Sequence, residues 1–412
     1  MTDIFIAGVG MTAFGKQLDR SLKHLGAEAT GLALADAGAA QRDIEAVFFG
    51  NCVQGHMEGQ DMIRGEIVAR AMGIQKVPVI NVENACATAS TALHLAAAYV
   101  RSGAADIVLA LGAEKMFSTD RARMFGAFDG AWDVHEIAAN RDTLLAMGEG
   151  VEVPDGTTST QPYSVFMDVY AAMSRAHMRT YGSTQAQLAA VAAKNHMHST
   201  GNPLAQYRAP FTVDEVLKAA PIAYPLTLPM CSPISDGAAA AVVCNAAGLK
   251  RLGGARDRVI RILASVLQTG SERQPTDYDR HVSRLGAARA YELAGVGPSE
   301  MDVAEVHDAT ATGEVIEVEA LGLVRPGEGG IAAVRGDTTI GGRIPVNPSG
   351  GLECRGHPIG ATGLAQVHEL TLQLRGEAGG RQVAGARLAI AQNGGGIVGV
   401  EEAVTAVTIL GR

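Results

Sequence analysis

Cys86 is the residue whose type and position most clearly point to chemistry. It stands where an apolar run becomes an alanine-rich amphipathic run, in the stretch VPVINVENACATASTALHLAAAYVRSG, residues 77–103. This pattern predicts a buried strand, a tight turn and a helix that begins at the cysteine. Unpaired backbone N–H groups and the helix dipole favour a thiolate at such a position. We therefore expect Cys86 to be an ionised nucleophile, although an inert buried cysteine is the simpler alternative for this segment alone.

Two histidines in the second half of the chain are candidate partners for this cysteine. His357 lies in the glycine-flanked turn GHPIGATG, before an amphipathic run, and His307 ends the apolar run VAEVH. A nucleophilic cysteine needs a base within hydrogen-bond reach. Either histidine alone is more often structural, but two such turns placed beside Cys86 favour a catalytic group.

The elements that must position these side chains alternate between strand and helix. Apolar runs at DIFIAGVG, AVFFGN, VPVINV and ADIVLALGAEK predict strands, and the run from Ser21 to Ala39 predicts a helix. We expect a mostly parallel sheet that is covered on both faces, with functional groups at the carboxyl ends of its strands.

The chain divides into two halves with a shared plan and one insertion. Residues 1–115 and 235–256 form the first half, because SDGAAAAVVCN needs a sheet to join. Residues 116–234 break the alternation with polar, Gly-rich and Pro-rich stretches, and we expect them to form an inserted loop or cap domain. Residues 257–412 repeat the strand, turn, helix, strand order around GRIPVNPSGG, GHPIGATG and ARLAIAQNGGG.

Composition excludes several classes of protein. A net charge of -9 disfavours a surface for nucleic acid, and no apolar segment is long enough to span a membrane. The first ten residues lack the features of a secretory signal, and the five cysteines are scattered. We expect a reduced, cytoplasmic protein without a metal site.

Other suggestive residues have simpler interpretations. Gly15 and Lys16 nearly complete a phosphate-binding loop, but Gln17 stands where a hydroxyl must hold magnesium. His196 and His198 are one residue apart and point to different sides of a helix, so we expect surface or capping histidines rather than a metal site. We interpret the remaining apolar or turn cysteines, Cys52, Cys231 and Cys244, as inert packed thiols.

Several motifs together resemble the thiolase superfamily. NACATAS, VHDAT, NPSGG, GHPIGATG and QNGGG have its order and spacing, and AAKNHMHSTGNPLAQY and PMCSPISDGAAAAV are most similar to its sterol-carrier-protein type. The resemblance implies an α/β protein with a five-layered αβαβα fold of two similar halves and a loop domain that helps to bind coenzyme A. It also implies a coenzyme A thioester as substrate, no permanently bound cofactor and a homodimer or homotetramer. Some such proteins work with a small partner that contains an OB-fold and a zinc ribbon.

The resemblance assigns roles to the candidate residues. It implies that Cys86 is acylated by the thioester, that His357 takes its proton, and that His307 helps to hold an oxyanion. Asn393 and the backbone near Gly395 are then candidates for oxyanion or substrate binding, since aligned donors stabilise the developing negative charge.

The sequence departs from this family at the second catalytic cysteine. Thiolases that make or break a carbon–carbon bond carry that cysteine in a C-x-G turn or directly after His-Asp. The two locations read Asn393-Gly394-Gly395 and His307-Asp308-Ala309, so both cysteines are missing. Neither an amide nor a methyl group can abstract an α-proton. Cys354 is a conceivable substitute, although we favour a spectator role for it, and His307 or Glu314 are alternatives.

Three functions follow from these residues. The first is a thiolase-like acyl-CoA acyltransferase that forms an acyl-Cys86 intermediate. The second is a retro-aldol carbon–carbon lyase acting on a steroid or terpenoid CoA thioester, which would explain the missing cysteines but not the retained Cys86. The third is a non-catalytic acyl-CoA or lipid carrier, which gains nothing from an activated thiol.

Overall fold

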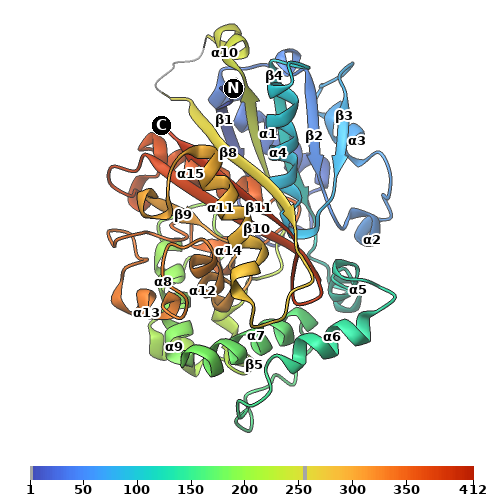
Figure 1. Cartoon of the computed structure of the whole chain (residues 1–412). Helices are drawn as coiled ribbons and strands as arrows, with labels where there is room; N and C mark the ends of the chain where they lie inside the picture. Colours follow the sequence, from blue (N-terminus) through green and yellow to red (C-terminus); the bar gives the residue numbers. More distant parts are fainter. Residues whose placement is uncertain (1–2, 254–257) are drawn as a thin grey trace.

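A mixed β-sheet runs through the centre of the molecule. The computed structural model describes residues 3–253 and 258–412, and within them the sheet has nine strands in the order β3-β2-β4-β7-β1-β8-β11-β10-β9 (Figure 1). The first half supplies β1 (Phe5–Met11), β2 (Ala46–Gly50), β3 (Val79–Val82), β4 (Ile107–Glu114) and β7 (Gly237–Cys244). The second half supplies β8 (Ile260–Thr269), β9 (Val303–Glu305), β10 (Leu388–Val398) and β11 (Glu401–Gly411).

The expectation of a mostly parallel sheet is wrong. Only β2 with β3, β2 with β4, and β10 with β9 pair in parallel within the described residues. β7 pairs antiparallel with both β4 and β1, and β11 pairs antiparallel with β10 and β8. The sheet is covered on both faces, so strands such as β4 and β7 are buried along their whole length, and hydrophobicity alone does not reveal whether they pair in parallel or antiparallel.

Helices cover the sheet in layers. α1 (Leu22–Ala37) and α3 (Arg64–Ala71) pack on the outer face of the first half, and α11 (Val282–Ala294) and α12 (Ala311–Ala320) on the outer face of the second. Between the halves lie α4 (Thr88–Arg101) and α15 (Thr362–Arg375), whose apolar side chains share one core with both inner faces. The result is the expected five-layered αβαβα fold.

The central position of α4 explains its alanine content. Ala89, Ala92, Ala96 and Ala97 have no exposed surface, and their small side chains allow α4 to pack between the sheet and α15. The two halves of the sheet meet at a narrow seam, where β1 and β8 share two residue pairs. The expected boundary between the halves, at residues 256 and 257, lies outside the described residues.

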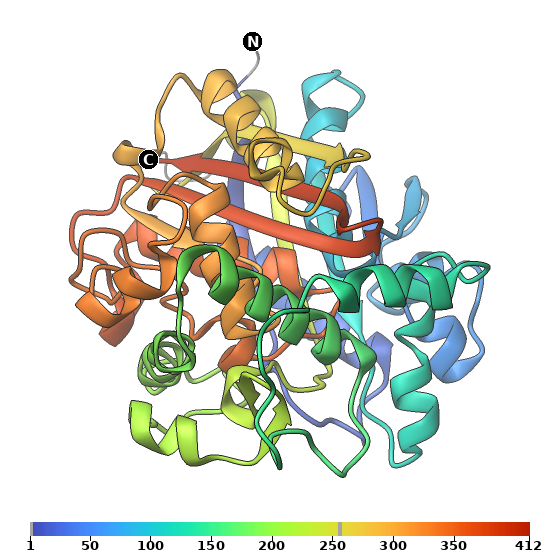
Figure 2. The ribbon, with the colours of Figure 1, turned by 60° about the horizontal axis from the view of Figure 1, so that its bottom comes forward.

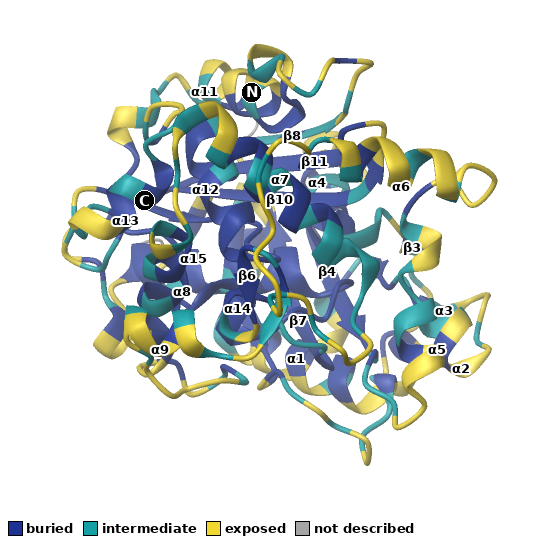
Figure 3. Cartoon of the chain, turned by 90° about the horizontal axis from the view of Figure 1, so that it is seen from below, coloured by how far each residue is buried: buried dark blue, intermediate teal, exposed yellow. Residues whose placement is uncertain are grey.

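The segment between β4 and β7 forms a layer of helices and loops below the sheet in Figure 1, and Figure 2 brings it forward. Its elements are α5 (Arg121–Gly126), α6 (Ile137–Ala146), α7 (Val165–Tyr181), α8 (Gln185–Ser199), α9 (Val213–Lys218), β5 (Pro221–Ala223) and β6 (Leu226–Thr227). Figure 3 shows exposed outer surfaces on α6 and α9 and the buried sheet behind this layer. A buried ion pair of 2.5 Å between Lys194 and Glu314 fastens α8 to α12.

The remaining α-helices of the described residues are short: α2 (Gln54–Glu58), α10 (Ala246–Leu252), α13 (Gly329–Arg335) and α14 (Gly351–Arg355). The strand expected at GRIPVNPSGG is reduced to one bridge between Val346 and Ala304. None of the described helices has the length and apolar character needed to cross a membrane.

Candidate active site

Cys86 lies on a strained turn between β3 and α4. β3 ends at Val82, a single 3₁₀ turn covers Ala85–Ala87, and α4 begins at Thr88. Ala85 has a φ of 46°, in the left-handed region that a non-glycine residue adopts only at a cost. The Thr88 hydroxyl stabilises the turn by accepting a hydrogen bond of 2.8 Å from the Asn84 N–H. The expected strand, tight turn and helix are therefore present.

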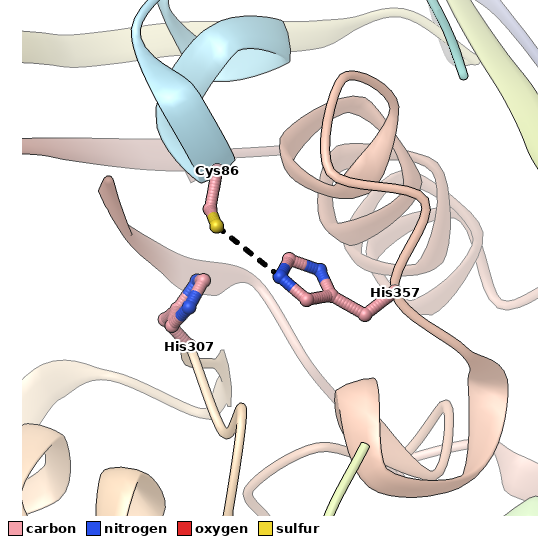
Figure 4. A group of neighbouring side chains, drawn as sticks. All are labelled: Cys86, His307 and His357. Atoms are coloured by element: carbon pink, nitrogen blue, oxygen red, sulfur yellow. Dashed lines mark hydrogen bonds between the residues drawn. The ribbon is translucent and has the colours of Figure 1, made fainter. Parts of the chain in front are cut away.

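His357 faces this cysteine from the second half of the chain. Its Nε2 lies 3.3 Å from the Cys86 Sγ, and the two side chains point toward each other in Figure 4. The other ring nitrogen, Nδ1, lies 2.7 Å from the Thr362 hydroxyl, which itself donates to the Pro358 carbonyl. Because that hydroxyl uses its proton on Pro358, Nδ1 carries the ring hydrogen and Nε2 is free to accept a proton from the thiol.

His307 completes a compact group with Cys86 and His357. The sulfur and one ring nitrogen of each histidine all lie within 4.8 Å of one another, and the two rings meet edge to face with centroids 5.2 Å apart. The Asn393 amide donates to His307 Nδ1 at 2.9 Å. Nε2 of His307 therefore carries the hydrogen and can donate it to an oxyanion.

Asn393 itself does not line the site. It is fully buried behind the His307 ring, and the Ser90 hydroxyl lies 3.0 Å from its carbonyl oxygen. Its amide protons point at His307, so the expected direct contact with a substrate gives way to a role in fixing the tautomer of that histidine.

Burial keeps the side chains of Cys86, His307 and His357 uncharged, contrary to the expected thiolate. Desolvation, reinforced by the nearby Glu114 carboxyl, raises the pKa of Cys86 to about 12. Desolvation also lowers the pKa of His307 to about 4 and that of His357 well below its usual value. The resting state is thus a thiol beside a neutral imidazole. The helix dipole does not outweigh burial here, in part because Cys86 lies in the 3₁₀ turn that precedes α4.

These groups lie at one side of a cavity of about 440 Å³. Its walls are mostly apolar and come from both halves and from the inserted segment; they include Phe125, Phe128, Phe166, Met167, Tyr170, Ile222, Ile234, Ile359 and Ile397. Ala309, at one of the two missing cysteine positions, contributes a methyl group to this wall. The apolar lining suits a hydrophobic chain, and the His307 and His357 rings beside it are uncharged.

Gly395 lets β10 approach the nucleophile turn. A Cβ atom at this position would lie 2.3 Å from the Asn84 carbonyl oxygen and 2.7 Å from the Ala87 nitrogen. Only glycine permits such an approach, so the expected place of Gly395 beside Cys86 has a steric basis.

Of the three alternative proton-transfer groups, His307 lines the cavity, whereas Cys354 and Glu314 do not. Cys354 is fully buried, which agrees with a spectator role. The Glu314 carboxylate accepts hydrogen bonds from Lys194, Asn195 and Asn347 and is therefore fully engaged in fastening α8.

The expectation for His196 and His198 is wrong in part. Both are buried rather than on the surface. They do point in different directions: His196 Nε2 lies near the Pro229 carbonyl and His198 Nδ1 near the Asn347 carbonyl. The Lys16 ammonium of the apparent phosphate loop lies over the ring of Phe117.

Comparison with known proteins places these features in a family. The description "Thiolase, N-terminal domain" matches residues 4–247, and "Thiolase C-terminal domain-like" matches residues 265–412. The chain belongs to the thiolase family. Its first match alone covers more than half of the chain, and Cys86 and His357 come from different matched domains.

Two curated relatives are similar to this chain over nearly its whole length. The acetyl-CoA acetyltransferase of Methanothermobacter thermautotrophicus is 39% identical over 402 residues, which is 97% of this chain and 98% of the relative. Sterol carrier protein 2 of Rattus norvegicus is 37% identical over 402 residues, which is 95% of this chain and 69% of the relative.

Two solved structures share the thiolase fold. The Ltp2-ChsH2(DUF35) aldolase has a TM-score of 0.77 at 24% identity, covering 99% of this chain and 97% of that one. Human mitochondrial 3-ketoacyl-CoA thiolase in complex with CoA has a TM-score of 0.71 at 17% identity, covering 100% and 98%.

Sequence reasoning missed the polar groups that border the thiolase site on its other side. Glu402 lines the cavity and lies near Glu317 and His281 in the folded chain. The pair Glu401-Glu402, directly before the apolar run AVTAVTIL, could have indicated these groups. Burying a charged side chain is costly, so acidic residues at the start of a buried strand often belong to a functional site.

Proposed function

We propose that this protein is a thiolase-type acyl-CoA acyltransferase that carries its acyl group as a thioester on Cys86. The observation that supports this most directly is the 3.3 Å approach of the Cys86 thiol to an imidazole nitrogen, His357 Nε2, that has no hydrogen of its own. A structural cysteine needs no such partner.

The first half-reaction uses this neutral pair. As Cys86 Sγ attacks the thioester carbonyl, its proton passes to His357 Nε2, so the thiol never has to ionise alone in a site that raises its pKa to about 12. The tetrahedral intermediate then collapses and expels the CoA thiolate, which takes the proton from His357. The products are acyl-Cys86 and free CoA.

The oxyanion of that intermediate meets preorganised donors. His307 offers its Nε2–H because Asn393 holds the opposite nitrogen, and burial keeps the ring uncharged. Donors that are fixed in place before the reaction stabilise a developing charge without reorganisation. In this proposal the polar main-chain groups of Gly395, which lie at the same edge of the cavity, also help to bind the oxyanion.

The inserted residues 116–234 form the outer wall of the acyl site in this proposal, between a first half of residues 1–115 and 235–256 and a second half of residues 257–412. They supply much of the apolar lining, together with the Arg121 guanidinium. The proposed substrate is an acyl-CoA thioester, and we expect no permanently bound cofactor.

Intact-mass spectrometry tests the acyl-enzyme. Incubation with acetyl-CoA or with longer acyl-CoA thioesters should add the mass of one acyl group to the wild-type protein, and Cys86→Ala should remain unmodified. Absence of the adduct across chain lengths contradicts the proposal, and stoichiometric acyl-CoA binding without adduct or product would indicate a carrier instead.

A retro-aldol lyase is the second candidate function. It is favoured by the likeness to the structure titled as an aldolase and by the missing cysteines at Ala309 and Asn393. Such a reaction needs a base for a hydroxyl group but no nucleophilic sulfur. Cleavage of a β-hydroxyacyl-CoA of steroid or terpenoid type that persists in Cys86→Ala would select this function over the acyltransferase.

Assembly is part of the proposal as well. We expect a homodimer or homotetramer, which light scattering on the purified chain measures directly. The name of the Ltp2-ChsH2(DUF35) aldolase joins two components, and a small OB-fold and zinc-ribbon partner is the corresponding candidate here. Co-purification with such a protein from the native host would identify it.

A further inference from the structure

A second group of titratable side chains lies beside the proposed acyl site. Glu402 is the second residue of β11, Glu317 is on α12, and His281 precedes α11. One oxygen of each carboxyl and one nitrogen of the ring lie within 4.8 Å of one another, and His281 Nε2 is 3.8 Å from Glu402 Oε2. Three separate elements therefore converge on one point, which is the border of a small cavity of about 50 Å³.

The two carboxyl groups lie too close together for both to be ionised. Glu317 is 1% exposed, and no protein donor reaches its Oε2. Two like charges so close together in a buried site repel each other strongly, so one of the two acids holds a proton. Burial, followed by the charge of Glu402, raises the pKa of Glu317 well above its usual value. Burial opposes ionisation of Glu402 too, but His281 and the Glu317 hydrogen bond outweigh it and lower its pKa. Glu317 thus holds the proton, and Glu402 is the carboxylate.

Glu402 also faces the acyl cavity. It lines that cavity together with Cys86, His307 and Gly394, and it is the member of the carboxyl pair with exposed side-chain surface, 19%. A Cβ atom on Gly394 would lie 2.6 Å from Glu402 Cγ. Glycine at 394 therefore makes room for the carboxylate side chain to pass.

The position of Gly394 gives this arrangement a chemical meaning. Gly394 is the middle residue of Asn393-Gly394-Gly395, the turn in which the resemblance leads us to expect a cysteine that moves protons. The sulfur is missing, and a carboxylate from the neighbouring strand lies beside the same turn. A carboxylate has the basicity for proton transfer that an amide lacks.

We propose that Glu402 is the catalytic base that removes the α-proton of the second thioester, and that Glu317 is a positioning residue that keeps it ionised and correctly oriented. The inference rests on the proposed function, because it requires a CoA thioester bound in the cavity beside Cys86.

The proposed step conserves atoms and charge. The Glu402 carboxylate takes a proton from the α-carbon, so that a C–H bond breaks, an O–H bond forms, and the electron pair becomes an enolate on the thioester. The enolate attacks the carbonyl carbon of acyl-Cys86, the carbon–carbon bond forms, and the C–S bond to Cys86 breaks. Glu402 then releases its proton to solvent, and the Cys86 thiolate takes one up.

Deuterium exchange measures this step apart from acylation. The wild-type protein is incubated with acetyl-CoA in D₂O, and the deuterium content of the recovered acetyl group is followed by mass spectrometry, alongside the intact-mass assay for acyl-Cys86. Glu402→Gln should form the adduct to the wild-type extent but lose exchange by about a hundredfold or more, the usual contribution of a general base. Glu272→Gln is the matched control, since Glu272 is an exposed carboxylate outside both cavities and should exchange as the wild type does.

The outcomes separate the two proposals. Exchange that survives in Glu402→Gln, or that is absent from the wild type, overturns the role of Glu402. Absence of the adduct with exchange intact overturns the acyltransferase but not the base, because enolisation needs no sulfur. If Glu402→Gln also loses the adduct, the variant Glu402→Asp, which keeps the charge, decides between the two explanations. A base role for Glu402 requires that Glu402→Asp forms the adduct and exchanges at least tenfold more slowly than the wild type. Exchange at the wild-type rate in Glu402→Asp refutes the base role.

Glu317 has its own test. Glu317→Gln retains a donor toward Glu402 and should keep exchange within about threefold of wild type, whereas Glu317→Leu removes the donor at similar volume and should reduce exchange by about tenfold, or 1.4 kcal/mol. Equal melting temperatures with equal exchange in the two variants would overturn the positioning role.

Discussion

The turns that carry Cys86 and His357 stand at the starts of α4 and α15, two helices that pack against each other in the central layer. The first turn depends mainly on backbone geometry, through the left-handed Ala85 and the close approach of Gly395, with support from the hydrogen bond that the Asn84 N–H donates to the Thr88 hydroxyl. Side chains hold the second: the Thr362 hydroxyl lies against the His357 ring, and the Ser235 hydroxyl accepts from its main-chain N–H at 3.0 Å.

This difference separates two tasks. Among the described residues, the Cys86 sulfur has His357 as its polar side-chain partner, so it stays free to follow an acyl group. The imidazole is fixed on both sides and cannot rotate away. Substitutions of side chains should therefore disable the base, while substitutions that change backbone packing should disable the nucleophile.

The largest effect is expected from removing the base itself. His357→Ala leaves the Cys86 thiol, whose pKa is raised to about 12, without a proton acceptor. The rate constant for acyl-Cys86 formation should fall by about 10²–10⁴-fold, as measured by quenched-flow mass spectrometry. Loss of less than tenfold would show that the two turns do not act as a pair.

The next effect concerns the tautomer of the base. Thr362→Val keeps the volume of the side chain but leaves the buried His357 Nδ1–H without its acceptor, which costs about 1–3 kcal/mol. Acylation should slow by about tenfold to a hundredfold. Thr362→Ser restores the hydroxyl and should recover most of the rate, and failure to recover it would point to packing instead.

A smaller effect is expected on the backbone-held turn. Gly395→Ala puts a methyl group against the Asn84 carbonyl and should lower the free energy of unfolding by about 1–3 kcal/mol, measured by denaturant titration. The matched control is Gly31→Ala in α1, where no neighbouring atom lies within 4 Å of a new Cβ and helix propensity should add up to about 1 kcal/mol. Equal stabilities would remove the steric argument for the first turn.

The last test changes no residue and concerns the pH dependence of Cys86 reactivity. Because the pKa of Cys86 is raised to about 12, its thiolate fraction grows through the whole neutral and mildly alkaline range. Alkylation of Cys86 by iodoacetamide should therefore rise about tenfold per pH unit between roughly pH 7 and 10, without the plateau near pH 8.5 of an ordinary thiol. Peptide mapping identifies the alkylated cysteine. An alkylation rate that does not change with pH above neutrality would support the Cys86 thiolate expected from the sequence.

The sequence was sufficient for the architecture and for the three side chains at the centre of the site. Cys86, His307 and His357 lie on punctuated strand–turn–helix patterns that local chemistry makes recognisable. Strand direction was not accessible, since β7 and most of β11 are buried on both faces, and such strands have similar sequences in parallel and antiparallel sheets.

The sequence also could not predict the protonation state of Cys86 or the pairing of the Glu402 and Glu317 carboxyl groups. The charge state of Cys86 depends on burial by residues hundreds of positions away, which outweighs the local helix dipole. Glu402 and Glu317 meet through the pairing of β11 and the packing of α12, so no local spacing connects them. The polar function of Asn393 toward His307 is likewise a tertiary contact.

The narrow seam between β1 and β8 has a consequence for maturation. Nucleophile and base are 271 residues apart, and the sheets of their halves share two residue pairs. A nascent chain that has left the ribosome only as far as its first half carries a thiol with no acceptor for its proton. In the proposed acyltransferase, reactivity toward thioesters therefore requires both halves of the chain to have folded together.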